Sequence, residues 1–311
     1  MEIIKIQGQS GFFKGGTNTG IYVFESGNVL LIDAGHTVQR GKRLVKHLAK
    51  QSLSPAYVFT THEHFDHFEA FEGIKEEIPS AQLISHYYAK PYIENLYLGM
   101  AYLSSSSIPS FFARRGNGLG QNPLESSRYH VDILVEDELV LEGKTFQIIH
   151  SPGHCAGQAA IITPDRVCYL GDIVMDNKII DTYDMPFLFS IELQEESLNR
   201  IKTLDFDYGL IAHSKNPYTK DEIVEIAERN LSVIRRYEKD ILTLLKQPMS
   251  REEILANLMV QNKVDCTYAS YHYNNSTVGA FLTKLSHTGE IGYRYCDGRI
   301  LYHLSGVENG V

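Results

Sequence analysis

Apolar residues in the first two thirds of the chain form short runs that end in polar residues. Residues 28–33 are one such run, and residues 57–60 are another, which leads directly into a histidine-rich stretch. Short continuous apolar runs between turn residues are typical of strands buried on both faces. Residues 38–51 instead carry Leu44 and Leu48 at helical spacing, which predicts a helix between these strands. The pattern predicts a mixed α/β (α+β) fold.

The same pattern of an apolar strand with a polar end recurs further along the chain. The recurrence carries more weight than any single run, because a buried strand often serves to point a polar residue into a site. The later runs are residues 146–150 before His154, residues 167–171 before Asp172, and residues 208–212 before His213.

Residues 86–130 differ from their surroundings, since they are rich in tyrosine, phenylalanine, serine and glycine. This composition predicts a partly helical aromatic insertion that folds over another part of the molecule. Within it, Arg114 and Arg115 are candidate contacts for an anionic group of a substrate. A dimer contact or plain packing explains the insertion equally well.

The last third of the chain predicts helices followed by a hairpin. Residues 218–246 carry apolar side chains at steps of three or four, which predicts one long helix. Residues 250–253 match a capping box, residues 277–287 predict a further helix, and the Asp-Gly pair at 297–298 predicts a hairpin turn. This order is similar to that of a winged helix, which we predict for residues 218–311.

The composition is that of an ordinary folded protein, and it excludes several classes. Of the 311 residues, 43% are hydrophobic and 22% are charged, which argues against disorder. The formal net charge of −9 argues against a protein that lives on nucleic acid or anionic lipid, because phosphate binding needs clustered basic residues. With no CxxC pair, no signal-peptide pattern and no membrane-length apolar run, we expect a cytoplasmic protein without membrane contact.

The most informative stretch is His62-x-His64-x-Asp66-His67, which follows the predicted 57–60 strand. Imidazole and carboxylate groups are the usual ligands of zinc and of similar divalent metals. His62 and His64 point the same way in extended backbone, and a following turn can aim Asp66 and His67 at a second position. These side chains therefore suit two adjacent metals better than one. The alternative is a solvated polar loop that merely contains histidines.

The order of these motifs resembles the metallo-β-lactamase superfamily over about residues 1–215. The resemblance implies a four-layer αββα sandwich for residues 1–217, followed by the winged-helix-like region. One motif departs slightly from the family, since the chain has Ala212-His213 where Gly-His is usual. The motifs are Asp33 after a strand, residues 62–67, residues 151–154, Gly171-Asp172 and Ala212-His213.

The resemblance further implies two bound divalent metal ions, with zinc as the first expectation and iron or manganese as alternatives. It divides the ligands into two groups of three and one bridging carboxylate. The ligands are His62, His64 and His154 for one ion, Asp66, His67 and His213 for the other, and Asp172 for both. Asp33 is expected to orient a ligand histidine without binding metal itself.

The motif combination is more similar to glyoxalase II and its relatives than to true β-lactamases. The implied reaction is hydrolysis of a small ester, thioester or lactone by a hydroxide shared between two metals about 3.5–4 Å apart. Asp172 and Asp66 are the expected catalytic residues, because one bridges the metals and the other is best placed to orient the nucleophile. The alternatives are a metal-dependent endoribonuclease or phosphodiesterase, and a catalytically idle binding or signalling protein.

Contacts to substrate and partners are less specified. Tyr183 and Phe187 follow the bridging Asp172 in a region that reaches the pocket of the resembling family, so they are candidate substrate contacts, with core packing as the equal alternative. The winged-helix-like region suggests nucleic acid, but its helix at 277–285 carries a single lysine. We therefore favour a small-molecule substrate, and a structural or homodimer-forming use of this region.

Overall fold

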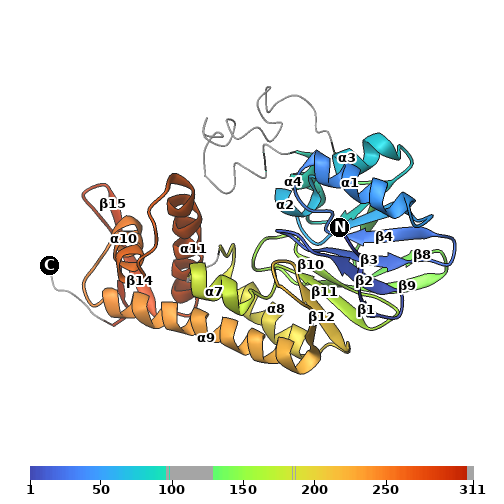
Figure 1. Cartoon of the computed structure of the whole chain (residues 1–311). Helices are drawn as coiled ribbons and strands as arrows, with labels where there is room; N and C mark the ends of the chain where they lie inside the picture. The colour runs from blue at the N-terminus through green and yellow to red at the C-terminus, as the bar shows by residue number, and fades with distance from the viewer. Residues whose placement is uncertain (96–97, 99–128, 184, 186, 307–311) are drawn as a thin grey trace.

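Two β-sheets form the centre of the computed structural model, which describes residues 1–95, 98, 129–183, 185 and 187–306 (Figure 1). The first sheet has seven strands in chain order, and the second has six in the order β13-β12-β11-β10-β9-β8. The first sheet consists of β1 (Ile4–Gln7), β2 (Ser10–Phe13), β3 (Thr19–Val23), β4 (Asn28–Ile32), β5 (Ser54–Thr60), β6 (Gln82–His86) and β7 (Ile133–Val135). The second consists of β8 (Glu138–Leu141), β9 (Lys144–His150), β10 (Ala159–Ile162), β11 (Val167–Gly171), β12 (Tyr208–Ile211) and β13 (Tyr218–Thr219).

Helices cover both outer faces of this pair of sheets. Neighbouring residues of a strand point to opposite faces. In β5, Val58 therefore packs with α1 and α3, whereas Phe59 packs between the sheets. In β11, Tyr169 packs between the sheets and Leu170 packs with α8 and α9. The predicted αββα sandwich is confirmed. The covering helices are α1 (Val38–Ala49), α3 (Phe71–Glu77), α8 (Ile191–Thr203) and α9 (Lys220–Leu244).

Beyond the sheets the chain forms two further helices and a hairpin. The predicted capping box is present, since the Ser250 hydroxyl accepts the backbone N–H of Glu253 and the Glu253 side chain accepts that of Ser250. Asp297 and Gly298 both have positive φ, as the predicted hairpin turn requires. The winged-helix assignment and the domain boundary after residue 217 stay predictions. The elements are α10 (Arg251–Gln261), α11 (Tyr268–His287), β14 (Ile291–Cys296) and β15 (Arg299–Leu304).

Helix α11 begins nine residues before residue 277, so the predicted start of this helix is wrong. It starts at Tyr268, where the Thr267 hydroxyl accepts the backbone N–H of Ser270 at 3.1 Å. The first half of α11 is rich in tyrosine, asparagine and serine and shows no apolar periodicity. The second half buries Val278 and Phe281, and only this half produces the helical pattern in the sequence.

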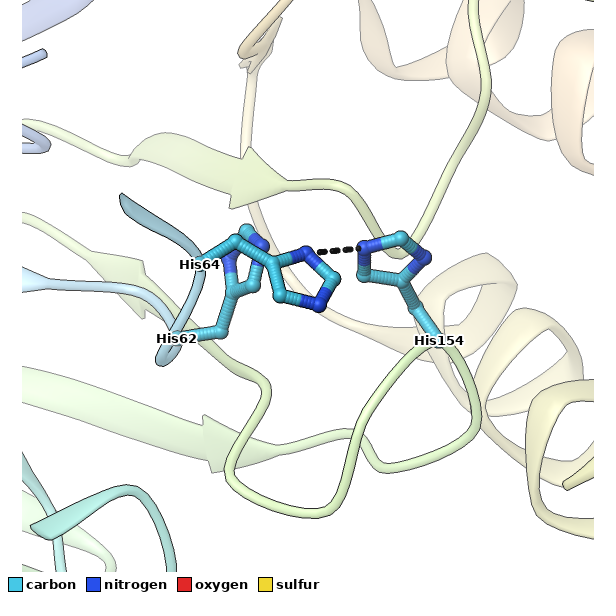
Figure 2. Close-up of side chains that lie close together, drawn as sticks. All are labelled: His62, His64 and His154. Carbon is cyan, nitrogen blue, oxygen red and sulfur yellow. Dashed lines mark hydrogen bonds between the residues drawn. The ribbon is translucent and has the colours of Figure 1, made fainter. Parts of the chain in front are cut away.

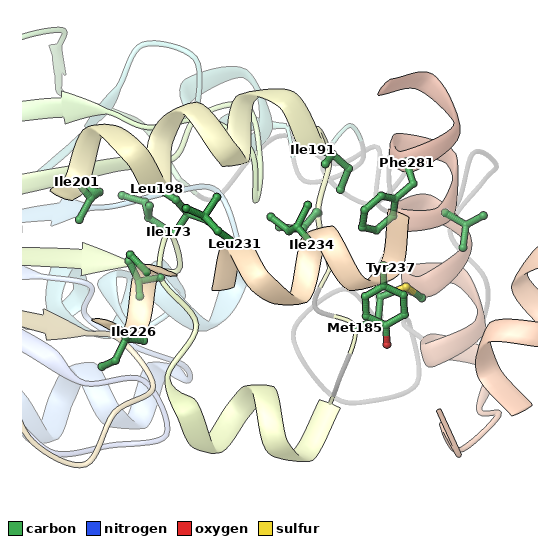
Figure 3. Close-up of a cluster of buried hydrophobic side chains, with 14 of the residues drawn as sticks. Ile173, Met185, Ile191, Leu198, Ile201, Ile226, Leu231, Ile234, Tyr237 and Phe281 are labelled. Atoms are coloured by element: carbon green, nitrogen blue, oxygen red, sulfur yellow. The ribbon is translucent and has the colours of Figure 1, made fainter. Parts of the chain in front are cut away.

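One hydrophobic cluster connects the second sheet to the C-terminal helices (Figure 3). Leu198 of α8 and Leu231 of α9 lie in it toward the sheets, and Phe281 of α11 lies at its other end. The ring of Phe281 lies 6.0 Å from that of Tyr237 of α9, measured between centroids. Because protein interiors are close-packed, such a cluster holds α11 firmly against the helices that cover the second sheet.

The remaining helices are short. The predicted aromatic insertion at 86–130 contains one of them at its start, but most of the insertion, with Arg114 and Arg115, lies outside the described residues. None of the described helices has the length and apolar character that a membrane span requires. The short helices are α2 (Phe65–Phe68), α4 (Lys90–Glu94) and α7 (Asn177–Tyr183).

Candidate metal centre

Strand direction explains why the polar strand ends meet. β9 and β11 are both antiparallel to β10, so they run the same way, and β12 is parallel to β11. Their carboxyl ends therefore lie at one edge of the second sheet, and the loops that follow carry His154, Asp172 and His213. The carboxyl end of β5 supplies residues 62–67 from the first sheet, through a loop and the short helix α2.

The first group of predicted ligands contains three histidines from two loops. Each of His62, His64 and His154 offers a nitrogen, and these nitrogens lie within 4.8 Å of one another. Figure 2 shows His62 and His64 facing His154, whose Nε2 lies 3.0 Å from His64 Nδ1. Two zinc-bound nitrogens at about 2.1 Å in a tetrahedral site lie about 3.4 Å apart. The histidines are therefore close to the spacing that one ion requires.

The second group contains Asp66, His67 and His213, whose ligand atoms also lie within 4.8 Å of one another. The carboxylate of Asp172 lies between the two groups. Its Oδ2 is 3.4 Å from His213 Nε2 and 3.5 Å from His67 Nε2 on one side, and 3.7 Å from His154 Nε2 on the other. This is the place that the sequence assigns to a bridging residue.

Three buried polar atoms test whether this cluster fits a metal. Among the described residues, His62 Nε2, His67 Nε2 and Asp172 Oδ1 have no hydrogen-bond partner. Leaving buried polar atoms unsatisfied is costly, and native proteins rarely do so. The three residues form one group with ligand atoms within 4.8 Å of one another. Divalent cations held by the two ligand groups would satisfy all three atoms, so the residues present fit such ions.

The opposite ring nitrogens of three histidines are held by oxygen acceptors. His67 Nδ1 lies 2.9 Å from Asp33 Oδ2, as the sequence predicts for an orienting carboxylate. The Nδ1 of His154 lies 2.9 Å from the carbonyl oxygen of Phe187, and that of His213 lies 2.8 Å from the carbonyl oxygen of Gly16. A proton on each Nδ1 leaves the Nε2 lone pair available as a metal ligand.

Sequence reasoning missed the loop between β2 and β3, which supports the second group. The Thr17 hydroxyl donates to Asp66 Oδ2 at 3.0 Å, next to the Gly16 carbonyl that holds His213. The Asn18 side chain fastens this loop by donating to the Ser214 carbonyl at 2.7 Å. In the sequence the Gly-Gly-Thr-Asn stretch is typical of any turn, so only the fold reveals its position.

The two groups differ in their affinity for protons. Burial, together with the neighbouring His154, lowers the pKa of His64 to about 3, and burial likewise lowers the pKa of His62 and His154. The Asp172 carboxylate raises the pKa of His213 to about 9 against the effect of burial. The first group thus holds neutral imidazoles ready for a cation, whereas the carboxylates of Asp66 and Asp172 attract positive charge to the second group.

The predicted substrate contacts are only partly described. The ring of Phe187 lies 5.8 Å from that of His64 and 5.7 Å from that of His154, between centroids, so it flanks the first group. On its other side it lies 5.9 Å from the ring of Tyr273, a residue of α11 that the sequence did not assign to the site. The Tyr183 side chain, like Arg114 and Arg115, lies outside the described part of the chain.

A four-layer sandwich with histidine and aspartate side chains gathered at its strand ends is typical of one class of protein. The model of the metallo-beta-lactamase superfamily matches residues 13–213, and the chain belongs to this superfamily. The matched range contains every residue that the sequence assigns to the metal site.

Individual relatives are distant. The chain is 21% identical to hydroxyacylglutathione hydrolase 1 of Vibrio vulnificus (strain YJ016) over 268 residues, which cover 81% of this chain and 88% of that protein. A beta-lactamase domain protein from Burkholderia ambifaria has a similar fold, with a TM-score of 0.71, 16% identity, and coverage of 98% of this chain and 94% of the other. A metallo-beta-lactamase family protein from Thermus thermophilus gives a TM-score of 0.65 at 19% identity, with 93% of each chain covered. These two likenesses concern the fold alone, C-terminal helices included.

Proposed function

We propose that the chain is a metal-dependent hydrolase that uses two divalent metal ions to cleave a small ester, thioester or lactone. One observation carries this proposal: two groups of ligand side chains share a strand-end edge, and the Asp172 carboxylate lies between them with an unsatisfied buried oxygen. A purely structural cluster has no use for such an arrangement. Zinc is the first expectation for both ions, with iron or manganese as alternatives, because imidazole and carboxylate suit all three.

Each residue has a distinct task in this proposal. Bound there, divalent ions lower the pKa of a coordinated water and polarise the scissile carbonyl. Asp172 holds the two groups at a fixed separation. The Asp66 side chain is 43% exposed, whereas that of His67 is fully buried. We therefore expect the substrate to approach beside Asp66, whose carboxylate, steadied by Thr17, orients the attacking water by accepting its hydrogen bond.

The substrate class rests on the pocket wall and on similarity. Phe187 gives the first group an apolar flank, which suits the acyl part or the leaving group of a small ester better than a highly charged chain. The relative in Vibrio vulnificus is called a hydroxyacylglutathione hydrolase, and its named substrate is a thioester. This similarity supports thioesters as the first substrates to test.

Cleavage of RNA or another phosphodiester is the second candidate, and one surface favours it. The hairpin exposes Tyr293 and Tyr295 by 57% and 78%, and Arg294 and Arg299 are exposed on its opposite face. Aromatic and basic side chains of this kind can bind single-stranded RNA by stacking and charge. The net charge of −9 weighs against it.

A panel of thioester, lactone, ester, phosphodiester and RNA substrates tests these proposals against each other. We expect hydrolysis of at least one acyl substrate, and a loss of roughly a thousandfold or more in His64→Ala, because both the activated water and the polarised carbonyl depend on bound metal. Turnover of RNA alone would instead favour the second candidate. Full activity and full metal content in His64→Ala would contradict the assignment of this site.

A further inference from the structure

Helix α11 touches the loop that carries Phe187 and thereby approaches the first ligand group. The backbone N–H of Leu188 donates to Thr277 Oγ1 at 3.1 Å. Thr277 is fully buried, and its hydroxyl donates in turn to the Tyr273 carbonyl at 3.2 Å within the helix. The hydroxyl proton is therefore directed along the helix, and the oxygen lone pairs face Leu188.

The residue before Leu188 is in contact with a metal ligand of the proposed site. The Phe187 carbonyl oxygen accepts the hydrogen bond from His154 Nδ1 at 2.9 Å. Behind it, the backbone N–H groups of Phe189 and Ser190 both donate to the Gly153 carbonyl, at 2.8 and 3.0 Å. Residues 187–190 are thus hydrogen-bonded both to the loop that carries His154 and to α11.

Helix α11 is held in place by its contacts with α8 and α9, so it can fix the position of residues 187–190. Lys284 pairs with Glu195 of α8 at 2.5 Å and also with Glu238 of α9. Phe281 of α11 packs in the shared hydrophobic cluster between these helices (Figure 3). Thr277 lies one turn before Phe281 on the same helix. The Leu188 N–H, which donates to Thr277, and the Phe187 carbonyl, which accepts from His154, belong to the same peptide unit.

We infer that Thr277 is a positioning residue of the metal centre, through which α11 fixes the Phe187 carbonyl and with it the ring of His154. The inference rests on the metal-binding part of the proposed function. It assigns the C-terminal helices a task in metal binding, although they supply no ligand from their described residues. Removing the hydroxyl takes away the acceptor of the Leu188 N–H and lets the Phe187 carbonyl turn away from His154 Nδ1.

The test is zinc affinity, measured by competition with a chelator, in wild type and Thr277→Val. We expect the affinity of the ion assigned to His62, His64 and His154 to fall about tenfold, at the lower end of what loss of an outer hydrogen bond to a ligand histidine causes. Thr277→Ser keeps the hydroxyl and should restore the affinity. Thr283→Val is the matched control, because the Thr283 hydroxyl donates to the Gly279 carbonyl on the exposed side of the same helix.

A double substitution separates positioning from general damage. In a His154→Ala background, Thr277→Val should cause no further loss of zinc affinity, because its route to the metal is already gone. A further loss there would overturn the inference. Wild-type zinc affinity in both Thr277→Val and Thr277→Ala would also overturn the inference. The alanine variant is included in case valine prevents folding. If the wild-type protein binds no zinc, the proposed function fails together with the inference. If the wild type and the Thr277 variants bind zinc equally well, only the inference fails.

Discussion

The strand-end loops and helix α11 both lie at the proposed metal centre, but they serve it in different ways. The loops supply the side chains that meet there, and the ligands lie shortly after the end of a strand or within a short helix. Helix α11 reaches the centre indirectly, through backbone atoms of residues 187 and 188 and through the ring of Phe187. Only certain residue types can bind the metal directly. The orientation of a ligand, in contrast, can be set by any part of the fold that fixes the position of a carbonyl group.

The largest effect on metal binding is expected from removal of the Asp33 carboxylate, which contacts the ligand histidine His67 directly. Asp33 accepts from His67 and also from the backbone N–H and hydroxyl of Thr61, at 2.8 and 2.9 Å. In Asp33→Asn we expect zinc affinity to fall between tenfold and a hundredfold, because the ring of His67 loses its charged acceptor. Chelator competition measures this.

Asp165→Asn is the matched control for that change, since the Asp165 carboxylate accepts from the Gln9 backbone and the Ser10 hydroxyl and serves no ligand histidine. Its zinc affinity should stay that of wild type. A smaller loss in Asp33→Asn than in Thr277→Val would reverse the comparison and make α11 the dominant support.

A smaller effect is expected at the missed loop between β2 and β3. Thr17→Val removes the hydroxyl that steadies Asp66, so the carboxylate should orient the attacking water less well. We expect kcat to fall roughly tenfold with KM nearly unchanged, in keeping with a loss confined to the transition state. Thr19→Val changes the first residue of β3, directly after this loop, but the Thr19 hydroxyl contacts Arg40 and Ala34 instead. The kcat of this variant should not change beyond the effect on stability. Equal losses in both variants would mean that the loop matters only for folding.

A separate effect concerns the stability of the fold in acid, rather than metal binding or turnover. Burial and the stacked ring of His150, 4.1 Å away between centroids, lower the pKa of His86 to about 4. The unfolded chain binds a proton at His86 below about pH 6.5 and the folded chain does so only near pH 4, so this residue should make unfolding easier as pH falls through that interval. Between about pH 6.5 and pH 4, the unfolding free energy of His86→Gln should fall by about 3 kcal/mol less than that of wild type. Urea unfolding at several pH values checks this, and an unchanged slope would contradict it.

The buried strands and the metal-binding character of residues 62–67 could be predicted from local signals, whereas the sandwich and the grouping of the ligands followed from the resemblance to a known superfamily. A strand buried on two faces leaves an apolar run, and metal ligands come from a few residue types, among them histidine and aspartate. Gly16, Phe187 and Thr277 act through a carbonyl or a hydroxyl, which many residues provide, so their positions are visible only after folding. The early start of α11 was missed for a related reason: the sequence of its first half is rich in tyrosine, asparagine and serine, so the apolar helical period is absent there.

The central claim is that the two groups of side chains hold two divalent ions bridged by Asp172. Elemental analysis of zinc-loaded and dialysed protein tests it most directly, in wild type, in Asp172→Asn and in Asp176→Asn. Asp176 is a buried aspartate that accepts from the Tyr218 hydroxyl at 2.6 Å and stands outside the site. We expect two zinc ions per chain in wild type and in Asp176→Asn, and fewer in Asp172→Asn. Zinc-free wild type, or undiminished zinc in Asp172→Asn, would contradict it.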